Sequence, residues 1–130
     1  MINQDGELLV PKRSPSKDLF PSMGDVSVSE HVNVRESYFD SVLRGFREEQ
    51  GVSIDPRNLR FILKVPVISS EQSEMCEYYA CRTDTIRGSA EIASQRWVPI
   101  QSLVGKDIGK ALNFRPDHLP ALERFISMYR

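Results

Sequence analysis

The 130-residue sequence has little of several features that would each point to a particular class of protein. It has only two cysteines, Cys76 and Cys81, whose spacing fits neither a CxxC pair nor a zinc site. No stretch approaches the roughly 20 apolar residues that a membrane-spanning helix needs. The formal net charge is −1, which gives no general affinity for nucleic acid polymers or membrane surfaces. These absences predict a cytoplasmic protein with reduced thiols, working without a membrane or a nucleic acid.

The length and the 40% content of hydrophobic residues suit one domain, residues 1–130, with one ordinary core. The residue patterns predict strands at Glu7–Arg13, Leu59–Ile68, Glu74–Thr83 and Glu91–Ile100, a short helical turn at Gln101–Lys106, and helices at about 38–50 and from Pro116 onward. The second and third strands follow one another closely enough to form a hairpin. This order predicts an α/β fold with helices packed on a sheet.

The first predicted helix has clear signals at both ends. Ser37 is a candidate N-cap, and Gly51 stands where a left-handed residue would end the helix. One apolar stripe follows the helical spacing i, i+3, i+4, i+7, through Phe39, Val42, Leu43 and Phe46.

The end of this helix carries charged residues that could hold a cation. Arg44 and Glu48 are i,i+4 neighbours, and Glu49 follows directly. Adjacent carboxylates repel one another unless a cation lies between them, and their hard oxygens suit Mg²⁺ or Mn²⁺. The alternative is a solvated helix face with an ordinary Arg–Glu pair worth roughly 0.3–0.5 kcal/mol.

A second group of charges lies upstream, in a loop that contains proline. Lys12, Arg13 and Lys17 are three cations close together in the sequence. Such a group can hold a phosphate, or it can be a solubilising basic edge.

The stretch from Glu36 to Val52, E-x7-R-G-F-R-E-E-Q-G-V, resembles the Nudix box, G-x5-E-x7-R-E-U-x-E-E-x-G-U, where U is aliphatic. Six residues match at the family spacing: Glu36, Arg44, Glu48, Glu49, Gly51 and Val52. The segments KRSPSKDLFPSMGDVSVSEHV, EMCEYYACRTD and FRPDHLPALERF resemble the branch of the family that includes isopentenyl-diphosphate isomerases. The resemblance therefore extends over nearly the whole chain.

This resemblance implies the Nudix fold, an α/β/α sandwich with a mixed sheet. It also implies a hydrolase that uses Mg²⁺ or Mn²⁺ to cleave a diphosphate linkage in a small molecule of the type nucleoside diphosphate-X. By position, Glu48 and Glu49 would bind the metal and Arg44 would orient them. Glu36 would support the site or bind metal through water, with Glu30 and Glu74 as weaker candidates. Arg13 and Lys17 would hold the diphosphate.

The sequence departs from the family pattern inside the box. Gly45 replaces a glutamate that is commonly a metal ligand, and Glu30 replaces the opening glycine. Restoring the carboxylate with Gly45→Glu is therefore expected to raise metal affinity. The departures also favour an alternative, a weakened or inactive relative that binds a diphosphate ligand or a protein partner. Isomerase activity is not expected, because Ser29 stands where the isomerases carry their catalytic cysteine.

Two further expectations concern the start of the chain. Family members usually have a full strand before the predicted turn Asn3-Gln4-Asp5-Gly6, whereas only Met1 and Ile2 precede it here. The first strand is thus short or missing, and the open edge would allow pairing with a partner chain, as in a homodimer. His31 is expected to pack at a strand end, with metal binding as the alternative.

Overall fold

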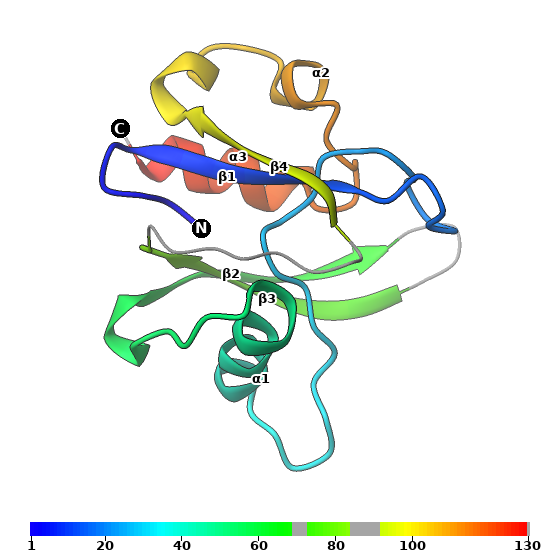
Figure 1. The fold of residues 1–130 in the computed structure, drawn as a ribbon, viewed down its shortest axis with the longest axis vertical. Helices are drawn as coiled ribbons and strands as arrows, with labels where there is room; N and C mark the ends of the chain where they lie inside the picture. The colour runs from blue at the N-terminus through cyan, green and yellow to red at the C-terminus, as the bar shows by residue number, and fades with distance from the viewer. Residues whose placement is uncertain (69–72, 84–91, 130) are drawn as a thin grey trace.

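The computed structural model describes residues 1–68, 73–83 and 92–129. Its elements are β1 (Glu7–Arg13), α1 (Tyr38–Gly45), β2 (Leu59–Ile68), β3 (Ser73–Cys81), β4 (Ile92–Pro99), α2 (Ile108–Leu112) and α3 (Leu119–Met128), as Figure 1 shows. The predicted bounds of β1 and β2 are confirmed, and β3 and β4 lie within a residue or two of the predicted strands. No described helix is long and apolar enough to cross a bilayer.

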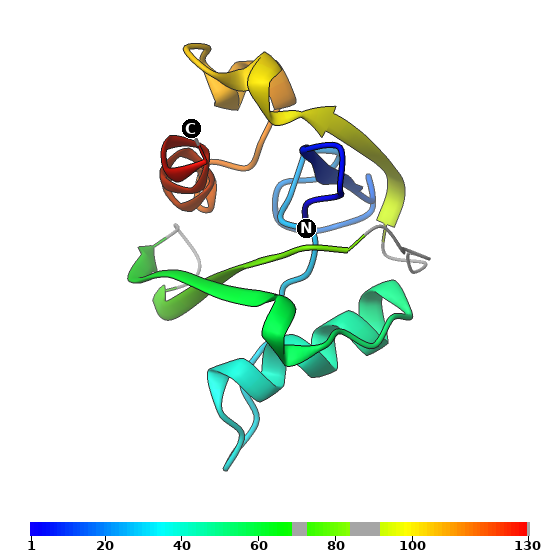
Figure 2. The ribbon, with the colours of Figure 1, turned by 90° about the vertical axis from the view of Figure 1, so that its left-hand side faces the viewer.

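The described strands form two antiparallel pairs, β1 with β4 and β2 with β3. The predicted hairpin of β2 and β3 is therefore confirmed. Ile2 connects the two pairs, because it bridges Leu8 in antiparallel fashion and Arg82 in parallel fashion. Figure 2 shows α1 and α3 on opposite sides of the β2–β3 pair. Helices on both faces of strands that run in both senses confirm the predicted α/β class.

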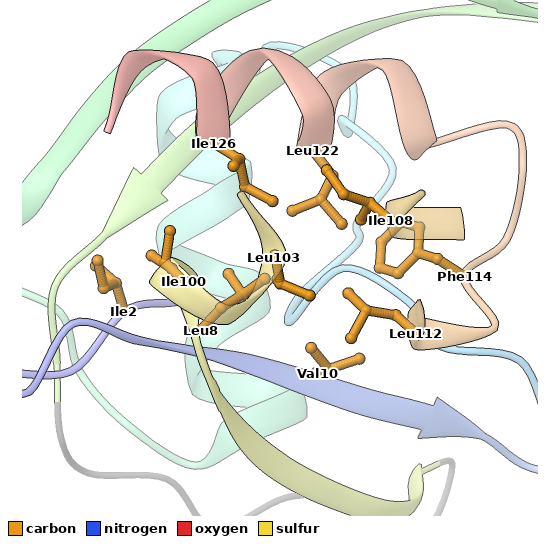
Figure 3. Close-up of a cluster of buried hydrophobic side chains, with 10 residues drawn as sticks. All are labelled: Ile2, Leu8, Val10, Ile100, Leu103, Ile108, Leu112, Phe114, Leu122 and Ile126. Carbon is orange, nitrogen blue, oxygen red and sulfur yellow. The ribbon is translucent and has the colours of Figure 1, made fainter. Parts of the chain in front are cut away.

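Two hydrophobic clusters hold these layers together, and β1 contributes to both. Leu8 and Val10 point into one cluster, whereas Leu9 points into the other. This division follows from the alternation of side chains along a strand. The first cluster joins β1 to α2 and α3, and Figure 3 shows its buried members: Ile2, Leu8, Val10, Ile100, Leu103, Ile108, Leu112, Phe114, Leu122 and Ile126. The second joins β1 to the end of α1 through Met1, Leu9, Phe46, Val52 and Cys81.

The helices differ from the sequence prediction in several respects. The predicted helix at 38–50 is α1 followed by a π-helical turn, η1 (Phe46–Gln50), and it ends at Gly51 with φ of 66° as expected. The final helix begins at Leu119, and Pro116 lies before it. α2, capped by Asp107, was missed because five residues are too few for a helical pattern to be recognised. The predicted turn at Gln101–Lys106 is a 3₁₀ segment, η3 (Ile100–Leu103).

Candidate active site

Two polar contacts hold α1 and η1 in place, one at the start of α1 and one at the end of η1. The Ser37 hydroxyl accepts a hydrogen bond from the Asp40 N–H at 3.0 Å, as the sequence predicted. Gln50 is fully buried, and its amide donates to the Ser27 carbonyl at 3.0 Å and to the Gln95 side chain at 2.9 Å. The π-helical turn between these anchors sets the direction of Glu48 and Glu49. Sequence reasoning missed Gln50, because its partners are distant along the chain.

Arg44 gathers three carboxylates, which we call the Arg44 cluster. Its guanidinium donates to both oxygens of Glu36 at 2.9 Å, and Nη1 lies 3.2 Å from Glu48 and 3.4 Å from Glu30. The hydrogen bonds from Arg44 hold the pKa of Glu36 down at about 2. Both oxygens of Glu36 are thus engaged, which makes it the least available of the predicted ligands and favours its supporting role.

Glu49 lies in the wall of a cavity of about 540 Å³ between the two strand pairs, which we call the inter-sheet cavity. One oxygen of Glu49 accepts from the Ser29 N–H at 3.2 Å. Glu30, Glu74 and His31 line the same cavity, whereas Glu48, Glu36 and Arg44 do not. Glu48 is instead well exposed beside it. The predicted acidic residues therefore form one region with two faces, one toward the cavity and one toward solvent.

The predicted phosphate-binding cations also line this cavity. Arg13 and Lys17 lie in its wall, as does Lys12. Arg13 is already engaged, since Nη1 is 2.8 Å from Asp25 and Nε donates to the Leu19 carbonyl at 2.9 Å. The structure thus brings the predicted cations to the same cavity as Glu49, Glu30 and Glu74, whereas Glu48 and Glu36 lie outside its lining.

Gly45 has no room for a side chain in the observed packing. A Cβ there would lie 2.7 Å from Cγ1 of Val28 and 3.3 Å from Cβ of Glu30. Real Cβ atoms essentially never approach another heavy atom as closely as 2.7 Å. The structure therefore argues against the expectation that Gly45→Glu simply restores a ligand, and it places Glu30 beside the position where the box glutamate would stand.

The donor chemistry at this region fits a hard divalent cation only in part. Among the described residues, no three His, Cys, Asp or Glu side chains are arranged so that they could hold a metal ion. Mg²⁺ keeps several waters, however, and is usually bound by one or two carboxylates together with substrate phosphates. Glu48 and Glu49 supply two such carboxylates, and Glu30 lies close by on the loop.

His31 and Glu74 line the cavity near each other. The expectation that His31 packs at a strand end is wrong, because its side chain is 81% exposed. Its Nδ1 lies 3.9 Å from the carboxylate of Glu74. The residue stands in a loop in which residues 31–35 are all exposed.

Sequence reasoning missed a buried ionic group, which we call the Asp25 cluster. Asp25 Oδ2 lies 2.8 Å from Arg13 and 3.1 Å from Arg115, and Arg115 also pairs with Asp117 at 2.6 Å. The pair of Arg115 with Asp117 could be expected, because the two residues are two positions apart in the sequence. Nothing in the sequence links Asp25 to Arg115, which lies 90 positions away.

Next to this cluster, the side chains of His118 and Tyr78 are hydrogen-bonded to each other. Burial lowers the pKa of His118 and raises that of Tyr78, so both side chains are neutral near pH 7. They line the inter-sheet cavity on the side of α3.

Known proteins resemble this chain in sequence. A Nudix hydrolase of Deinococcus radiodurans is 33% identical over 106 residues, which are 80% of this chain and 62% of that protein. An isopentenyl-diphosphate Delta-isomerase of Kocuria rhizophila is 29% identical over 112 residues, 80% of this chain and 61% of that protein. The chain thus spans about three fifths of the length of these relatives. No family model matches it.

Solved structures resemble it in fold. The crystal structure of DR0079 from Deinococcus radiodurans superposes with a TM-score of 0.74 at 30% identity, covering 99% of this chain and 78% of that one. The NUDIX domain of Shewanella oneidensis NrtR, complexed with ADP ribose, gives a TM-score of 0.70 at 15% identity, covering 95% of this chain and 78% of that one. The chain belongs to the Nudix superfamily.

Proposed function

We propose that the protein is a metal-dependent hydrolase that cleaves a diphosphate linkage in a small molecule of the type nucleoside diphosphate-X. One observation carries this proposal: Glu49 shares the inter-sheet cavity with Arg13 and Lys17, and the Arg44 cluster adjoins it. Carboxylates for a cation and cations for a phosphate are thus within reach of one small ligand. The likeness to a Nudix hydrolase and to a domain seen with ADP ribose supports the same class of substrate.

In this proposal Glu48 and Glu49 hold Mg²⁺ or Mn²⁺, and Glu30 is the next candidate ligand. A bound cation would supply charge neutralisation at the phosphoryl oxygens and a water of lowered pKa. Arg44 holds Glu48 in place through its contact of 3.2 Å. Three carboxylates contact this single guanidinium, so the Arg44 cluster keeps excess negative charge that favours a cation.

The basic side of the cavity binds and orients the substrate. Lys17 offers a flexible point charge on the loop that leads away from β1, which suits a phosphate whose position changes during reaction. Arg13 is held in a fixed direction by Asp25 and by the Leu19 carbonyl, so it is preorganised for one phosphate position.

A second candidate function is binding without turnover. The specific observation in its favour is that no three potential ligands converge among the described residues, while Glu36 is fully engaged by Arg44. Such a protein would bind a diphosphate ligand, or a protein partner, on the Nudix scaffold.

The test combines a metal titration with an activity assay. Mn²⁺ or Mg²⁺ is added to millimolar concentration, with and without ADP-ribose or a nucleoside diphosphate, and amide NMR signals and melting temperature are followed. The proposal predicts shifts confined to η1 and the 28–31 loop, and release of phosphate-containing product. Glu49→Gln is expected to abolish the release.

Glu123→Gln is the matched control, because Glu123 is exposed on α3, outside the cavity lining. It should leave metal binding and turnover unchanged. Metal-dependent shifts without any product would favour the binding function, and the absence of shifts at millimolar metal would contradict the hydrolase. Retained turnover in Glu49→Gln would mean that another carboxylate has the role assigned to Glu49.

A further inference from the structure

The loop that follows β1 is closed at its base and carries one of the predicted phosphate-binding cations. The Arg13 N–H donates to the Met23 carbonyl at 2.9 Å, so residues 14–22 leave the end of β1 and return to it. We call this segment the Lys17 loop. Lys17 lines the inter-sheet cavity. The conformation of the loop therefore decides where this cation stands at the cavity.

Two residues of the Lys17 loop adopt a backbone conformation that usually favours glycine. The φ angle is 48° at Phe20 and 61° at Ser22. Other residues enter this left-handed region at a cost in free energy, because their Cβ atom crowds the backbone. Such a conformation persists where contacts with the surrounding structure fix it. The Lys17 loop thus depends on contacts outside itself to keep its shape.

Both guanidinium groups of the Asp25 cluster supply such contacts. Nε of Arg13 donates to the Leu19 carbonyl at 2.9 Å. The guanidinium carbon of Arg115 lies 4.8 Å from the centre of the Phe20 ring, within the range of a cation–π interaction. The loop is therefore attached to the Asp25 cluster at two consecutive residues, shortly after Lys17.

Arg115 is a fixed support for the Phe20 ring. Its side chain is buried, and it donates to the two oxygens of Asp117 at 2.7 and 2.6 Å and to Asp25 at 3.1 Å. A guanidinium held by these bonds cannot follow a moving loop. Phe20 itself is only partly buried, and truncating its side chain leaves the ion pairs of Arg115 in place. The loop can thus be released by substitution without breaking the cluster.

We propose that Phe20 is a positioning residue for the diphosphate site. Its ring, held on Arg115, keeps the Lys17 loop in the conformation that presents Lys17 to the inter-sheet cavity. A lysine side chain is long and flexible, so the position of its backbone decides which phosphate positions its ammonium group reaches. A loop fixed before binding also avoids the entropic cost of being ordered by the ligand. This inference rests on the proposed function, in which the basic side of the cavity binds the diphosphate.

The test is a double-mutant cycle on the binding of methylenebisphosphonate, a diphosphate analogue whose P–C–P bridge resists hydrolysis. Calorimetry in the presence of Mg²⁺ measures its dissociation constant for the unaltered chain, Phe20→Ala, Lys17→Ala and the double variant. Phe20→Ala is expected to weaken binding about fivefold or more in the unaltered background. Where Lys17 is already alanine it should weaken binding by less than about twofold, because the ring acts through Lys17.

Two further variants separate the ring from a general effect on folding. Phe20→Trp keeps an aromatic face for Arg115, so its affinity should stay within about twofold of that of the unaltered chain. Phe61→Ala is the matched control, because it removes a half-exposed ring on β2 that lies outside the cavity lining. It should leave the dissociation constant unchanged.

Equal losses from Phe20→Ala in the two backgrounds would show that the ring does not act through Lys17, and they would overturn the inference. Unchanged affinity in Phe20→Ala or in Lys17→Ala would overturn it as well, as would the absence of binding by the unaltered chain. The readout is binding and involves no hydrolysis. Coupling between Phe20 and Lys17 without product release would therefore contradict the hydrolase alone, whereas product release with equal losses would contradict the positioning role alone.

Discussion

Two arginine-centred clusters adjoin the inter-sheet cavity, and they differ in burial and in charge balance. In the Asp25 cluster, Arg13 and Arg115 face two aspartates, Asp25 and Asp117, and the charges are balanced. In the Arg44 cluster, three carboxylates contact one guanidinium, and Glu48 remains 58% exposed.

This difference separates a structural ion network from a candidate binding site. A balanced buried network satisfies its own charges, and the loss of one partner leaves another charge buried without compensation. An unbalanced cluster in contact with water can take up a further cation, and its members contribute little to folding. The two clusters should therefore respond in opposite ways to the same kind of substitution.

The largest effect is expected from Asp25→Asn. The change removes the carboxylate that Arg13 and Arg115 share, and breaking a buried ion pair typically costs about 3–5 kcal/mol. Urea unfolding measures the loss. Asp55→Asn is the matched control, because it breaks the surface pair with Arg57, which is 89% exposed, and it should leave the free energy of unfolding nearly unchanged. Equal losses in the two variants would contradict the structural role of the Asp25 cluster.

A smaller loss is expected from Gly45→Ala, which tests the packing beside the Arg44 cluster. The added Cβ meets Val28 at 2.7 Å, and overpacking costs about 1–3 kcal/mol, against a gain of about 1 kcal/mol in helix propensity. The same substitution in a Val28→Ala background removes the obstructing methyl group. There it should be neutral or stabilising in urea unfolding, and equal losses in both backgrounds would show that Val28 is not the obstacle.

Acid should weaken the folded state through His118, at the edge of the Asp25 cluster. Burial lowers the pKa of this side chain below its usual 6.5, so the unfolded chain binds a proton that the folded chain excludes. Stability is therefore present above pH 6.5 and is lost as the pH falls, by up to about 1.4 kcal/mol per pH unit for one proton.

Melting temperatures between pH 5 and 8 measure this dependence. The Met1 amine acts in the same direction between pH 8.0 and about 6, so the two groups must be separated. His118→Gln keeps a hydrogen-bonding partner for Tyr78. It should flatten the dependence of melting temperature on pH below pH 6.5 and leave the part above pH 6.5 unchanged. An unchanged slope would mean that His118 does not carry the proton uptake.

The smallest effect on stability is expected from Glu48→Gln, in the Arg44 cluster. The pair with Arg44 is exposed, so its loss should change the free energy of unfolding by less than about 0.5 kcal/mol. Affinity for Mn²⁺, measured by titration, should nevertheless fall by about tenfold or more. Asp40→Asn, on the exposed first turn of α1, serves as the control and should alter neither quantity. A large loss of stability with unchanged metal affinity would assign the Arg44 cluster a structural role.

Much of the region around Arg44 could be predicted from the sequence, because its interactions are local. Arg44 and Glu48 are one helical turn apart, Ser37 caps the helix, and Gly51 ends it. The spacing of these residues alone brings them together once a helix forms. The π-helical turn was not predictable in this way, since the burial of Phe46 and Gln50 decides it.

The Asp25 cluster could not be predicted, because its members come from distant parts of the chain. Nothing near Asp25 in the sequence indicates Arg115, and their contact exists only because Gly24 forms bridges to both Lys12 and Phe114. The crowding around Gly45 could not be predicted either. The sequence shows that the box glutamate is missing, but only the structure shows that Val28 and Glu30 fill the space that its side chain would need.

The sequence by itself determined the α/β class, the bounds of β1 and β2, and the helix that carries Arg44, Glu48 and Glu49, because alternation, helical spacing and capping act over a few residues. Only the tertiary structure decided which charges neighbour one another across the chain, and that Glu49, Arg13 and Lys17 share one cavity. These features depend on contacts between distant segments, and no local pattern encodes them.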